Sequence, residues 1–376
     1  MASVALVAHW DWVLYHFRLP LAQRLRARGA TVTFICPPGP YVPGLQAAGF
    51  RWLPWPVARR SLHPLREARA VARLARLYRR ERFAAVQHFT IKPILYGSLA
   101  ARRAGGPVVL NTFTGLGFLF SRHPLAAALR VAVLPLLRGL LHAPATYTVF
   151  QNPADQARLV GTRLVPAARA RLIPGTGVDV QRFAPAPAGA NDAAPVALLA
   201  ARLLWDKGVG EFVAAARQLR AAGVAAQFWV AGAPDPGNPA CIPAAQLARW
   251  QAEGAVTFLG PVADMPALLR QAAVAVLPSY YPEGAPRFLM EAAAAGLPLV
   301  GSDIPGCRMV IEPGVNGLLV PPRDAAALAA ALARLLRDPA ARAAMGRASR
   351  ALAVARFDEQ VLLDAYEALY REAGVL

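Results

Sequence analysis

The chain has 376 residues, of which 56% are hydrophobic and 17% are charged, and its formal net charge is +19. This composition excludes a disordered chain, and the length fits two domains of about 180 residues better than one. The cysteines are scattered, at Cys36, Cys241 and Cys307, without metal-ligand spacing. They favour a reducing compartment such as the cytoplasm.

The first half of the chain alternates short apolar runs with helical patterns. Its opening residues, 1–12, lack a basic region and a cleavage site, so we expect a first strand and no signal peptide. The longest uncharged run, 104–121, holds Asn111 and several glycines, so we expect no transmembrane helix. The patterns predict strands at 4–9, 31–36, 84–89, 107–113 and 146–152, and helices at 18–29, 44–49, 64–81, 95–105 and 124–141.

The second half repeats this alternation after a junction rich in Pro, Gly and Ala at 174–195. Strands are expected at 195–204, 225–232, 255–260, 273–279 and 297–303, with helices between them. Strands that alternate with helices predict parallel sheets covered on both faces. We therefore expect an α/β protein of two doubly wound, Rossmann-like domains, 1–178 and 179–355, facing across a cleft, and a C-terminal helix at 356–376 that packs back on the first domain.

The positive charge lies in one half of the chain. Residues 1–180 carry 24 Lys and Arg against 5 Asp and Glu, whereas residues 181–376 carry 17 of each kind. Arginines at 66, 69, 73, 76 and 80 follow helical spacing, so they line one face of the helix at 64–81. A solvated helix face would explain them, but the neutral second half favours an anionic partner, such as a membrane surface that the apolar helix at 124–141 also enters.

The segment YYPEGAPRFLMEAAAAG, residues 280–296, sets one carboxylate before a turn and another after it. Pro286 suits the first position of a helix, and the amides of Gly284 and Ala285 then open at the positive end of that helix, where a phosphate can bind. Glu283 and Glu291 would reach hydroxyl groups on either side of the phosphate. The alternative is two solvated glutamates near a helix start.

Lysine is rare in this chain. Of 41 Lys and Arg residues only Lys92 and Lys207 are lysines, and both lie in loops expected to follow strands. A compact ammonium group fits a crowded phosphate pocket differently from a planar guanidinium. With Arg202, five residues earlier, Lys207 could neutralise a diphosphate. The alternative is chance retention of the two lysines.

Several longer motifs of the chain resemble a known family. AARLLWDKGVGEFVAAARQL, GVDVQRF, SYYPEGAPRFLMEAAAAGLPLVGSDIPGCRMVI and NGLLVPPRD look like the retaining glycosyltransferases of family 4, which have a GT-B fold. FRLPLA, QHFTIKPILYGSLAAR and NTFTGLGFLFS extend the likeness into the first half. They resemble the subgroup that builds bacterial capsule, O-antigen and lipid-linked oligosaccharides.

The resemblance implies roles for the residues that match. Glu283 corresponds to the carboxylate that contacts the transferred sugar, and Glu291 to the one that holds the ribose of the nucleotide. Arg202 and Lys207 correspond to the pair that grips the diphosphate, so the catalytic group would be Glu283, Arg202 and Lys207. The resemblance also implies a metal-independent enzyme without a cofactor, because no Asp-x-Asp signature is present.

The first half departs from the family in two places. Thr114, next to Gly115, stands where many relatives carry a His that positions the sugar, and the usual N-terminal glycine pair is missing. The remaining polar candidates for the acceptor side are His16, Arg18, His88 and Lys92.

The function implied is transfer of a sugar, an N-acetylhexosamine by resemblance, from a UDP-sugar to a polyprenyl-diphosphate-linked saccharide in surface-glycan or glycoprotein-glycan assembly. The expected partners are the nucleotide sugar, the lipid-linked acceptor and an anionic membrane, with the enzyme peripheral on the cytoplasmic face. Alternatives are a GT-B epimerase of UDP-N-acetylhexosamine, or a non-enzymatic protein that binds anionic surfaces. Nucleic acid is not an expected partner, because no basic groove with interleaved aromatic residues is present.

Overall fold

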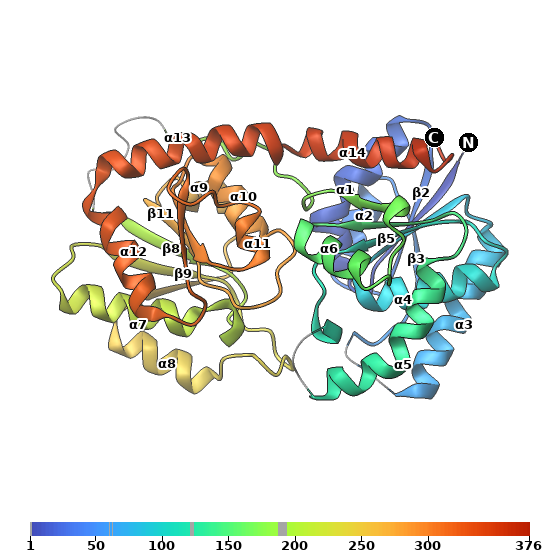
Figure 1. Ribbon diagram of the computed structural model, residues 1–376, viewed down its shortest axis with the longest axis horizontal. Helices are drawn as coiled ribbons and strands as arrows, with labels where there is room; N and C mark the ends of the chain where they lie inside the picture. The colour runs from blue at the N-terminus through green and yellow to red at the C-terminus, as the bar shows by residue number, and fades with distance from the viewer. Residues whose placement is uncertain (1, 60, 62, 121–123, 187–193) are drawn as a thin grey trace. The chain divides into compact units, whose positions relative to one another are not determined.

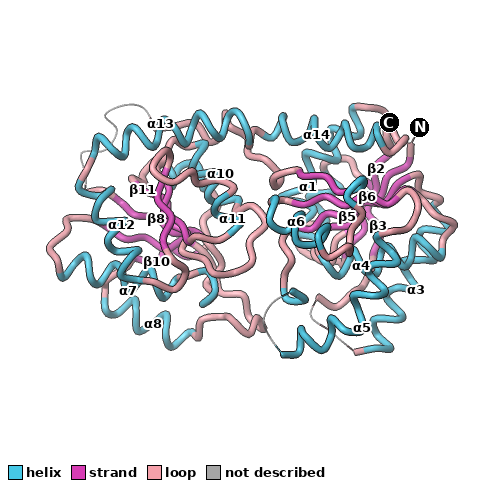
Figure 2. The backbone as a smooth tube through the Cα atoms, viewed as in Figure 1, coloured by secondary structure: helices cyan, strands magenta, loops and turns pink. Residues whose placement is uncertain are grey.

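The computed structural model describes residues 2–59, 61, 63–120, 124–186 and 194–376 (Figure 1). Its contacts divide the chain into two compact units, one of residues 1–176 with 362–376 and the other of residues 177–361. In each unit the strands form a central layer with helices beside it, as Figure 2 shows. The expected α/β class with two doubly wound sheets is thereby confirmed.

The first unit contains a parallel sheet of seven strands in the order β3-β2-β1-β4-β5-β6-β7. The strands are β1 (Ser3–Val7), β2 (Thr31–Cys36), β3 (Arg51–Pro54), β4 (Ala85–Phe89), β5 (Val108–Phe113), β6 (Thr146–Phe150) and β7 (Ala170–Leu172). The middle strands are buried along nearly their whole length, as their unbroken apolar runs predict.

Helices cover both faces of this sheet. One hydrophobic cluster joins the strands to α1 (Asp11–Ala27) and α2 (Val42–Ala47), and another joins them to α3 (Pro64–Glu81) and α4 (Ile91–Arg103). The unit also holds α5 (Pro124–Leu141) and α6 (Pro153–Gly161), with short 3₁₀ turns η1 (Phe118–Phe120) and η2 (Ala167–Arg169). The helices expected at 64–81 and 124–141 have the bounds that their patterns predicted.

The second unit contains a parallel sheet of six strands in the order β10-β9-β8-β11-β12-β13. Its strands are β8 (Val196–Ala200), β9 (Gln227–Ala231), β10 (Thr257–Gly260), β11 (Val274–Leu277), β12 (Leu299–Ser302) and β13 (Gly317–Val320). The helices and turns are η3 (Trp205–Lys207), α7 (Val209–Ala221), α8 (Ala244–Glu253), α9 (Met265–Leu269), α10 (Arg287–Ala294), α11 (Pro305–Arg308), α12 (Ala325–Arg337) and α13 (Pro339–Arg356).

The last helix, α14 (Glu359–Glu372), belongs by its contacts mainly to the first unit. Tyr370 donates through its hydroxyl to Gln87 in β4 at 2.8 Å, and Leu362, Tyr366 and Leu369 pack in the core under β1 and β2. The boundaries therefore differ from the expected ones at 178 and 355: the first unit consists of residues 1–176 and 362–376, and the second of residues 177–361. Part of the expected junction, 187–193, lies outside the described residues.

Two features of the described residues bear on ligands and membranes. No helix among them is long and apolar enough to cross a bilayer. Within the same ranges, no group of three or more His, Cys, Asp and Glu side chains is arranged to hold a metal ion.

Candidate active site

Each sheet has one point at which the strand order reverses. In the second unit it lies between β8 and β11, and in the first unit between β1 and β4. Ligands of doubly wound sheets bind beyond the carboxyl ends of the strands at such points. The segments that follow these four strands are therefore the places to look for functional side chains.

The segment after β8 carries Arg202 and Lys207. It is fastened to the segment after β11, because the backbone carbonyl of Asp206 accepts hydrogen bonds from the amides of Tyr280 at 2.9 Å and Tyr281 at 3.0 Å. Gly208 makes this approach possible: a Cβ there would lie 2.1 Å from the carbonyl oxygen of Pro278, and its φ is +77°. Lys207 is thus held beside the loop that carries Glu283.

Lys207 and Glu283 form an ion pair through Nζ and Oε1. Both side chains are largely buried, with 11% and 13% of their surface exposed. The Ser279 hydroxyl donates to the same Oε1 at 3.0 Å, and Gly306 lets the main chain of Glu283 approach, since a Cβ at 306 would lie 2.8 Å from its carbonyl oxygen. The two residues that the sequence placed in different roles therefore meet directly.

Arg202 also has a carboxylate partner. Its Nη1 lies 2.7 Å from Oδ2 of Asp235, which follows β9, and Asn238 donates to the same oxygen at 3.2 Å. The Arg202 side chain keeps 36% of its surface exposed. A second cation thus stands close to the switch point with room to turn towards a ligand.

Asp206 adds a buried carboxyl group that the sequence analysis did not single out, although it stands in the motif LLWDKG. Its Oδ1 has no hydrogen-bond partner among the described residues and is shielded from solvent. Burial raises the pKa of this carboxyl, and the nearby cations Lys207 and Arg202 oppose that rise. The segment after β8 therefore combines an orphaned acceptor with two cations.

Glu291 lies on α10, where Arg287 donates to its Oε1 through Nε at 2.7 Å. Burial raises the pKa of the Glu291 carboxyl, and Arg287 and Arg182 act against that rise. Pro286 is the capping residue of α10, one position before the expected start, and the helix begins at Arg287. Gly284 and Ala285 precede it as expected, in the loop that links Glu283 to the helix.

In the first unit, His88 is fully buried in β4. Its Nδ1 lies 2.8 Å from Oδ1 of Asn111 and its Nε2 lies 3.0 Å from the hydroxyl of Tyr78. Burial lowers the pKa of His88 to about 4, whereas the Asn111 hydrogen bond acts in the opposite direction. Since both ring nitrogens have partners and no surface is exposed, His88 packs the core and lines no surface for an acceptor.

Lys92 has a structural set of contacts. Its Nζ donates to the carbonyl oxygens of Ala58 at 2.7 Å and Ser61 at 2.9 Å, and pairs with Oε2 of Glu67 at 2.8 Å. Two hydrogen bonds and one ion pair thus hold the ammonium group. A lysine at position 92 is therefore explained by structure, because it fastens the segment before α3 to α4.

Arg18 is buried too, with 2% of its surface exposed, and its guanidinium stacks on Phe89 at 4.1 Å and contacts Tyr366 of α14. It therefore joins α14 to the sheet. His16 is exposed, with its ring packed against Tyr41 at 4.9 Å. Thr114 and Gly115 follow β5 and are partly buried, so of the expected acceptor-side residues His16, Thr114 and Gly115 reach the surface.

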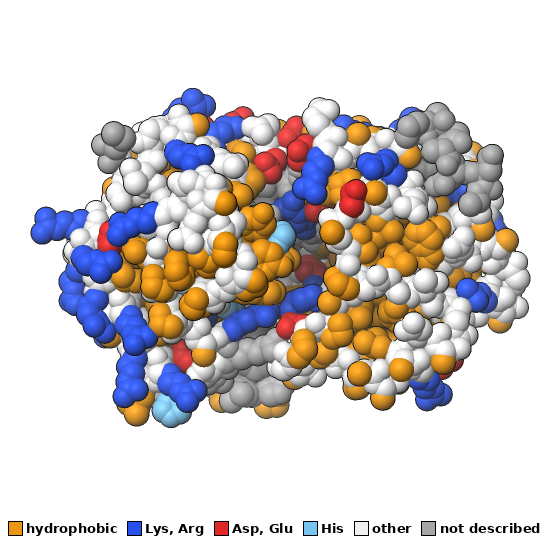
Figure 3. Space-filling view, turned by 180° about the vertical axis from the view of Figure 1, so that it is seen from behind, with side chains coloured by type: hydrophobic (Ala, Val, Ile, Leu, Met, Phe, Trp, Pro, Cys, Tyr) orange, Lys and Arg blue, Asp and Glu red, His pale blue; other side chains and the backbone are white. Residues whose placement is uncertain are grey.

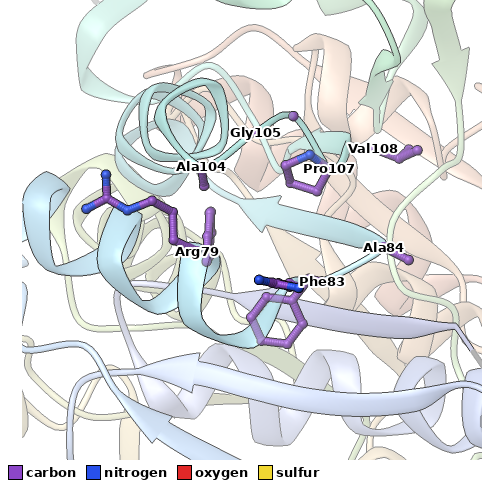
Figure 4. A pocket seen from close by; sticks show the side chains of 10 residues that line it. Arg79, Phe83, Ala84, Ala104, Gly105, Pro107 and Val108 are labelled. Carbon is purple, nitrogen blue, oxygen red and sulfur yellow. The ribbon is translucent and has the colours of Figure 1, made fainter.

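Two open pockets lie away from the switch points. The first, of about 460 Å³, is at the amino ends of β4 and β5, between Arg79 of α3 and the segment Ala104–Val108 (Figure 4). It is on the edge opposite to the carboxyl ends of the strands, so it is unrelated to the candidate active site. The second, of about 470 Å³, lies between α5 and α6 and is lined by Arg130, Arg138 and Arg158.

Comparison with known proteins assigns both halves of the chain. Residues 3–151 match the family described as glycosyl transferase 4-like, and residues 194–338 match the family described as glycosyl transferases group 1. Among individual proteins, the chain is similar to the N,N'-diacetylbacillosaminyl-diphospho-undecaprenol alpha-1,3-N-acetylgalactosaminyltransferase of Campylobacter jejuni. The identity is 28% over 378 residues, and the match covers 98% of each chain.

A glycogen synthase of Mycobacterium tuberculosis is 36% identical over 200 residues, which cover 52% of this chain and 47% of the relative. Among solved structures, a sucrose-phosphate synthase from Thermosynechococcus elongatus has a TM-score of 0.81 at 23% identity, covering 99% of both chains. The HepE protein of Anabaena, in complex with UDP-glucose, has a TM-score of 0.80 at 21% identity, covering 99% of this chain and 100% of its own. These structures share the fold of this chain.

Proposed function

Because this chain belongs to the glycosyltransferases with a GT-B fold, we propose that it moves an N-acetylhexosamine from a UDP-sugar to a saccharide carried on a polyprenyl diphosphate, with retention of the anomeric configuration. The observation that supports this most is the group after β8 and β11: two cations, Arg202 and Lys207, stand beside the carboxylate of Glu283 at the switch point of the second sheet.

The cations suit the charge that develops on the leaving UDP. As the bond between C1 of the sugar and the diphosphate oxygen breaks, negative charge moves onto the diphosphate, and preorganised cations in a partly buried site stabilise it. Arg202 and Lys207 supply that charge in place of a divalent metal. The new bond from the acceptor oxygen to C1 forms on the face that the diphosphate leaves, and the departing phosphate oxygen takes the acceptor's proton.

The carboxylates then divide between the sugar and the ribose. When the diphosphate enters, Lys207 turns from Glu283 to the phosphate oxygens, and Glu283 becomes available to accept hydrogen bonds from the transferred sugar. Glu291, on the first turns of α10, accepts from the ribose hydroxyls, and the amides of Gly284 and Ala285 meet the phosphate at the amino end of this helix. No cofactor besides the UDP-sugar substrate is needed in this scheme.

The choice of sugar and acceptor follows the relative with full-length coverage. That relative is named for transfer of N-acetylgalactosamine to a saccharide on diphospho-undecaprenol. We extend the class of donor, a UDP-N-acetylhexosamine, and the class of acceptor, a polyprenyl-diphosphate-linked saccharide, to this chain. The assembly of a surface glycan or a protein-linked glycan is the process that uses such a product.

The first unit is suited to an anionic membrane surface. The arginines of α3 expected on one face are all exposed, whereas Val71, Leu74 and Tyr78 are buried. In the turned view of Figure 3, Lys and Arg side chains gather at the lower left, where α3 lies. Near an anionic bilayer each such side chain contributes about 1 kcal/mol of binding free energy.

Helix α5 adds an apolar contribution to the same unit. Val131 is 80% exposed and Leu136 is 43% exposed, and their spacing of five residues puts them on different sides of the helix. Arg130 and Arg138 of this helix line the second pocket beside them. Exposed apolar side chains on a helix that also carries arginines suit the boundary between lipid tails and phosphate groups. We place the enzyme on the cytoplasmic face of the membrane, where nucleotide sugars and a polyprenyl diphosphate meet.

A donor screen tests the proposed function. The purified chain is given one nucleotide sugar at a time, with a synthetic polyprenyl diphosphate carrying N,N'-diacetylbacillosamine, and released UDP and the lipid product are measured. We expect turnover with a UDP-N-acetylhexosamine and an α-linked product, read by the anomeric coupling in the NMR spectrum. Absence of transfer from every nucleotide sugar would overturn the function, and a β-linked product would overturn retention.

A further inference from the structure

His9 and Thr90 meet at the switch point of the first sheet. His9 follows β1 and Thr90 follows β4, and these neighbouring strands are the pair at which the strand order reverses. The Nδ1 of His9 lies 2.8 Å from Oγ1 of Thr90. Both residues lie at the carboxyl ends of the strands, the edge at which doubly wound sheets bind ligands.

Thr90 is held in a strained backbone conformation. Its φ is +74° and its ψ is 159°, a region that is populated almost only by glycine. A β-branched residue is strained in this conformation, and glycine would avoid the strain. Thr90 is the residue before α4 but does not cap the helix with its side chain. Threonine differs from glycine at this position by its hydroxyl group, which contacts His9.

His9 keeps one ring nitrogen for another partner. With Nδ1 engaged by Thr90, Nε2 has no hydrogen-bond partner among the described residues, and the side chain is only partly buried. Burial, with Arg59 and Lys92 nearby, lowers the pKa of His9 to about 4, so the ring is neutral at pH 7. A neutral imidazole can donate to or accept from a hydroxyl group through Nε2, according to its tautomer.

Two tryptophans follow His9 closely in the chain. Trp10 follows His9 and stacks on Trp12 with ring centroids 4.9 Å apart, and the guanidinium of Arg59 lies 4.1 Å from the Trp10 ring. Both tryptophans are partly exposed. Trp12 and Arg59 thus pack against the Trp10 ring, and the segment after His9 is rich in partly exposed aromatic surface.

We propose that His9, held by Thr90, binds a hydroxyl group of the acceptor saccharide through Nε2. This inference rests on the proposed function and assigns its acceptor site to the switch point of the first unit. His9 is a binding residue, and Thr90 is a positioning residue that acts through His9.

The test compares His9→Gln, His9→Ala and Thr90→Gly with the wild type, and His142→Gln serves as the matched control. His142 is an exposed histidine of the same unit, next to α5, whose Nε2 lies 3.1 Å from the carbonyl of Arg163. The acceptor is the polyprenyl diphosphate with N,N'-diacetylbacillosamine. We expect the acceptor KM to rise about five- to tenfold in the His9 variants, the size expected for one hydrogen bond, with the donor KM and UDP affinity unchanged.

Thr90→Gly separates strain from function. We expect it to raise the melting temperature, because glycine removes the strain, and also to raise the acceptor KM, because the hydroxyl is lost. A role confined to folding predicts a normal KM in this variant. An unchanged acceptor KM in all three variants, or a rise in the donor KM instead, would overturn the proposal.

A second measurement does not depend on turnover. The imidazole NMR signals of His9, identified by their absence from His9→Gln, are followed while the soluble 1-phosphate of N,N'-diacetylbacillosamine or UDP is added. Shifts with the sugar phosphate and none with UDP support the site, and no shift with the sugar phosphate rejects it. Failure of the donor screen with a positive titration would reject the proposed reaction and leave the saccharide site standing.

Discussion

Lys207 and Glu283 are ion-paired although 76 positions separate them in the chain. Both side chains are largely buried, so each would leave an uncompensated charge if the other were removed. The pair joins the segments that follow the two central strands β8 and β11. The site that we assign to the diphosphate is therefore also a contact that stabilises the second unit.

Lys207→Met should separate these two effects. We expect kcat/KM to fall about 100-fold or more through loss of a preorganised charge on the leaving group. The free energy of unfolding should fall by about 2–4 kcal/mol, since Glu283 is left buried without its partner. Steady-state kinetics and urea unfolding measure the two quantities.

The double variant Lys207→Met with Glu283→Gln supplies the contrast. Removing both charges should recover most of the stability, because no buried charge is left alone, while activity stays low. Arg220→Ala, which removes an exposed cation from α7, serves as the control and should change neither quantity. Near-wild-type kinetics in Lys207→Met would contradict the assignment to the diphosphate.

Glu291 gives a pH-dependent prediction. Its pKa is raised in the folded state, mainly by burial, so its contribution to stability is complete below the ordinary glutamate pKa and is lost as the pH rises through the folded value. The neutral Glu291→Gln should therefore gain stability relative to the wild type as the pH rises from about 4 to 7.5. The same variant should bind UDP-sugar more weakly at pH 7.5, because a carboxylate accepts ribose hydroxyls better than an amide does.

Thermal unfolding across this pH range and calorimetric titration measure the two effects. Glu312→Gln is the matched control, since this glutamate is exposed and lies outside the candidate site. A stability difference that does not change with pH would show that the Glu291 carboxyl is not shifted. Wild-type affinity for UDP-sugar in Glu291→Gln would remove it from the ribose site.

Lys92 should be needed for stability more than for catalysis. Lys92→Met removes the donor to the carbonyls of Ala58 and Ser61 and the cation that pairs with Glu67, so we expect a loss of about 2–4 kcal/mol in the free energy of unfolding. Burial alone would raise the pKa of Glu67, but hydrogen bonds from Lys92, Tyr96 and Ser61 outweigh it and lower the pKa. The stability from Glu67 is thus present above its ordinary pKa and is lost as the pH falls through the lower folded value.

In Lys92→Met that acid-dependent loss should become smaller, which urea unfolding at pH 7 and pH 3.5 would show. Lys92→Arg is the informative control: it keeps the charge, but its planar group cannot direct three donors as the ammonium does. We expect it to be intermediate. Full stability of Lys92→Met with a large loss of acceptor binding would restore Lys92 to the acceptor site that its sequence position suggested.

His88 should make the first unit sensitive to acid. The folded pKa is about 4 against an ordinary value of 6.5, so the neutral ring stabilises the fold above pH 6.5, and this stability is lost as the pH falls towards 4. At 1.36 kcal/mol for each pH unit, the loss is about 3 kcal/mol. His88→Gln should be less stable than the wild type at pH 7 but should lose less on acidification; His9→Gln, measured alongside, separates the other histidine with a low pKa.

The sequence predicted the elements of the fold better than the contacts among functional groups. Periodicity placed α3 and α5 correctly because each is long and has a clear pattern. It missed β7, which has only 3 residues, and also β13, although β13 is as long as β11 and β12, which were predicted. The motifs pointed to Glu283 and Lys207, yet nothing local could show that they are paired. His88 and Lys92 were candidates for the acceptor side because of their chemistry, while burial and the geometry of their partners indicate structural contacts.

The last prediction concerns the exposed arginines of α3, of which Arg69, Arg73 and Arg76 form the central part. Vesicle flotation should show binding of the wild type to bilayers with anionic lipid, with weaker binding at higher salt, because charges at a surface are screened over about 8–10 Å at physiological ionic strength. Changing the three arginines to Glu should abolish binding to these vesicles. At about 1 kcal/mol for each basic side chain, losing three costs about 3 kcal/mol, or roughly a 100-fold weaker partition, before the added repulsion of three carboxylates.

The matched control changes Arg334, Arg337 and Arg347 to Glu. These are exposed arginines on α12 and α13 of the second unit, so the net charge of the chain changes by the same amount at another place. If net charge alone decided binding, both triple variants would fail equally, and α3 would have no special part. A third variant, Val131→Ser with Leu136→Ser, tests the exposed apolar side chains of α5. It should weaken the binding that persists at high salt, because burial of apolar surface is not screened by ions, and an unchanged high-salt fraction would exclude α5 from the contact.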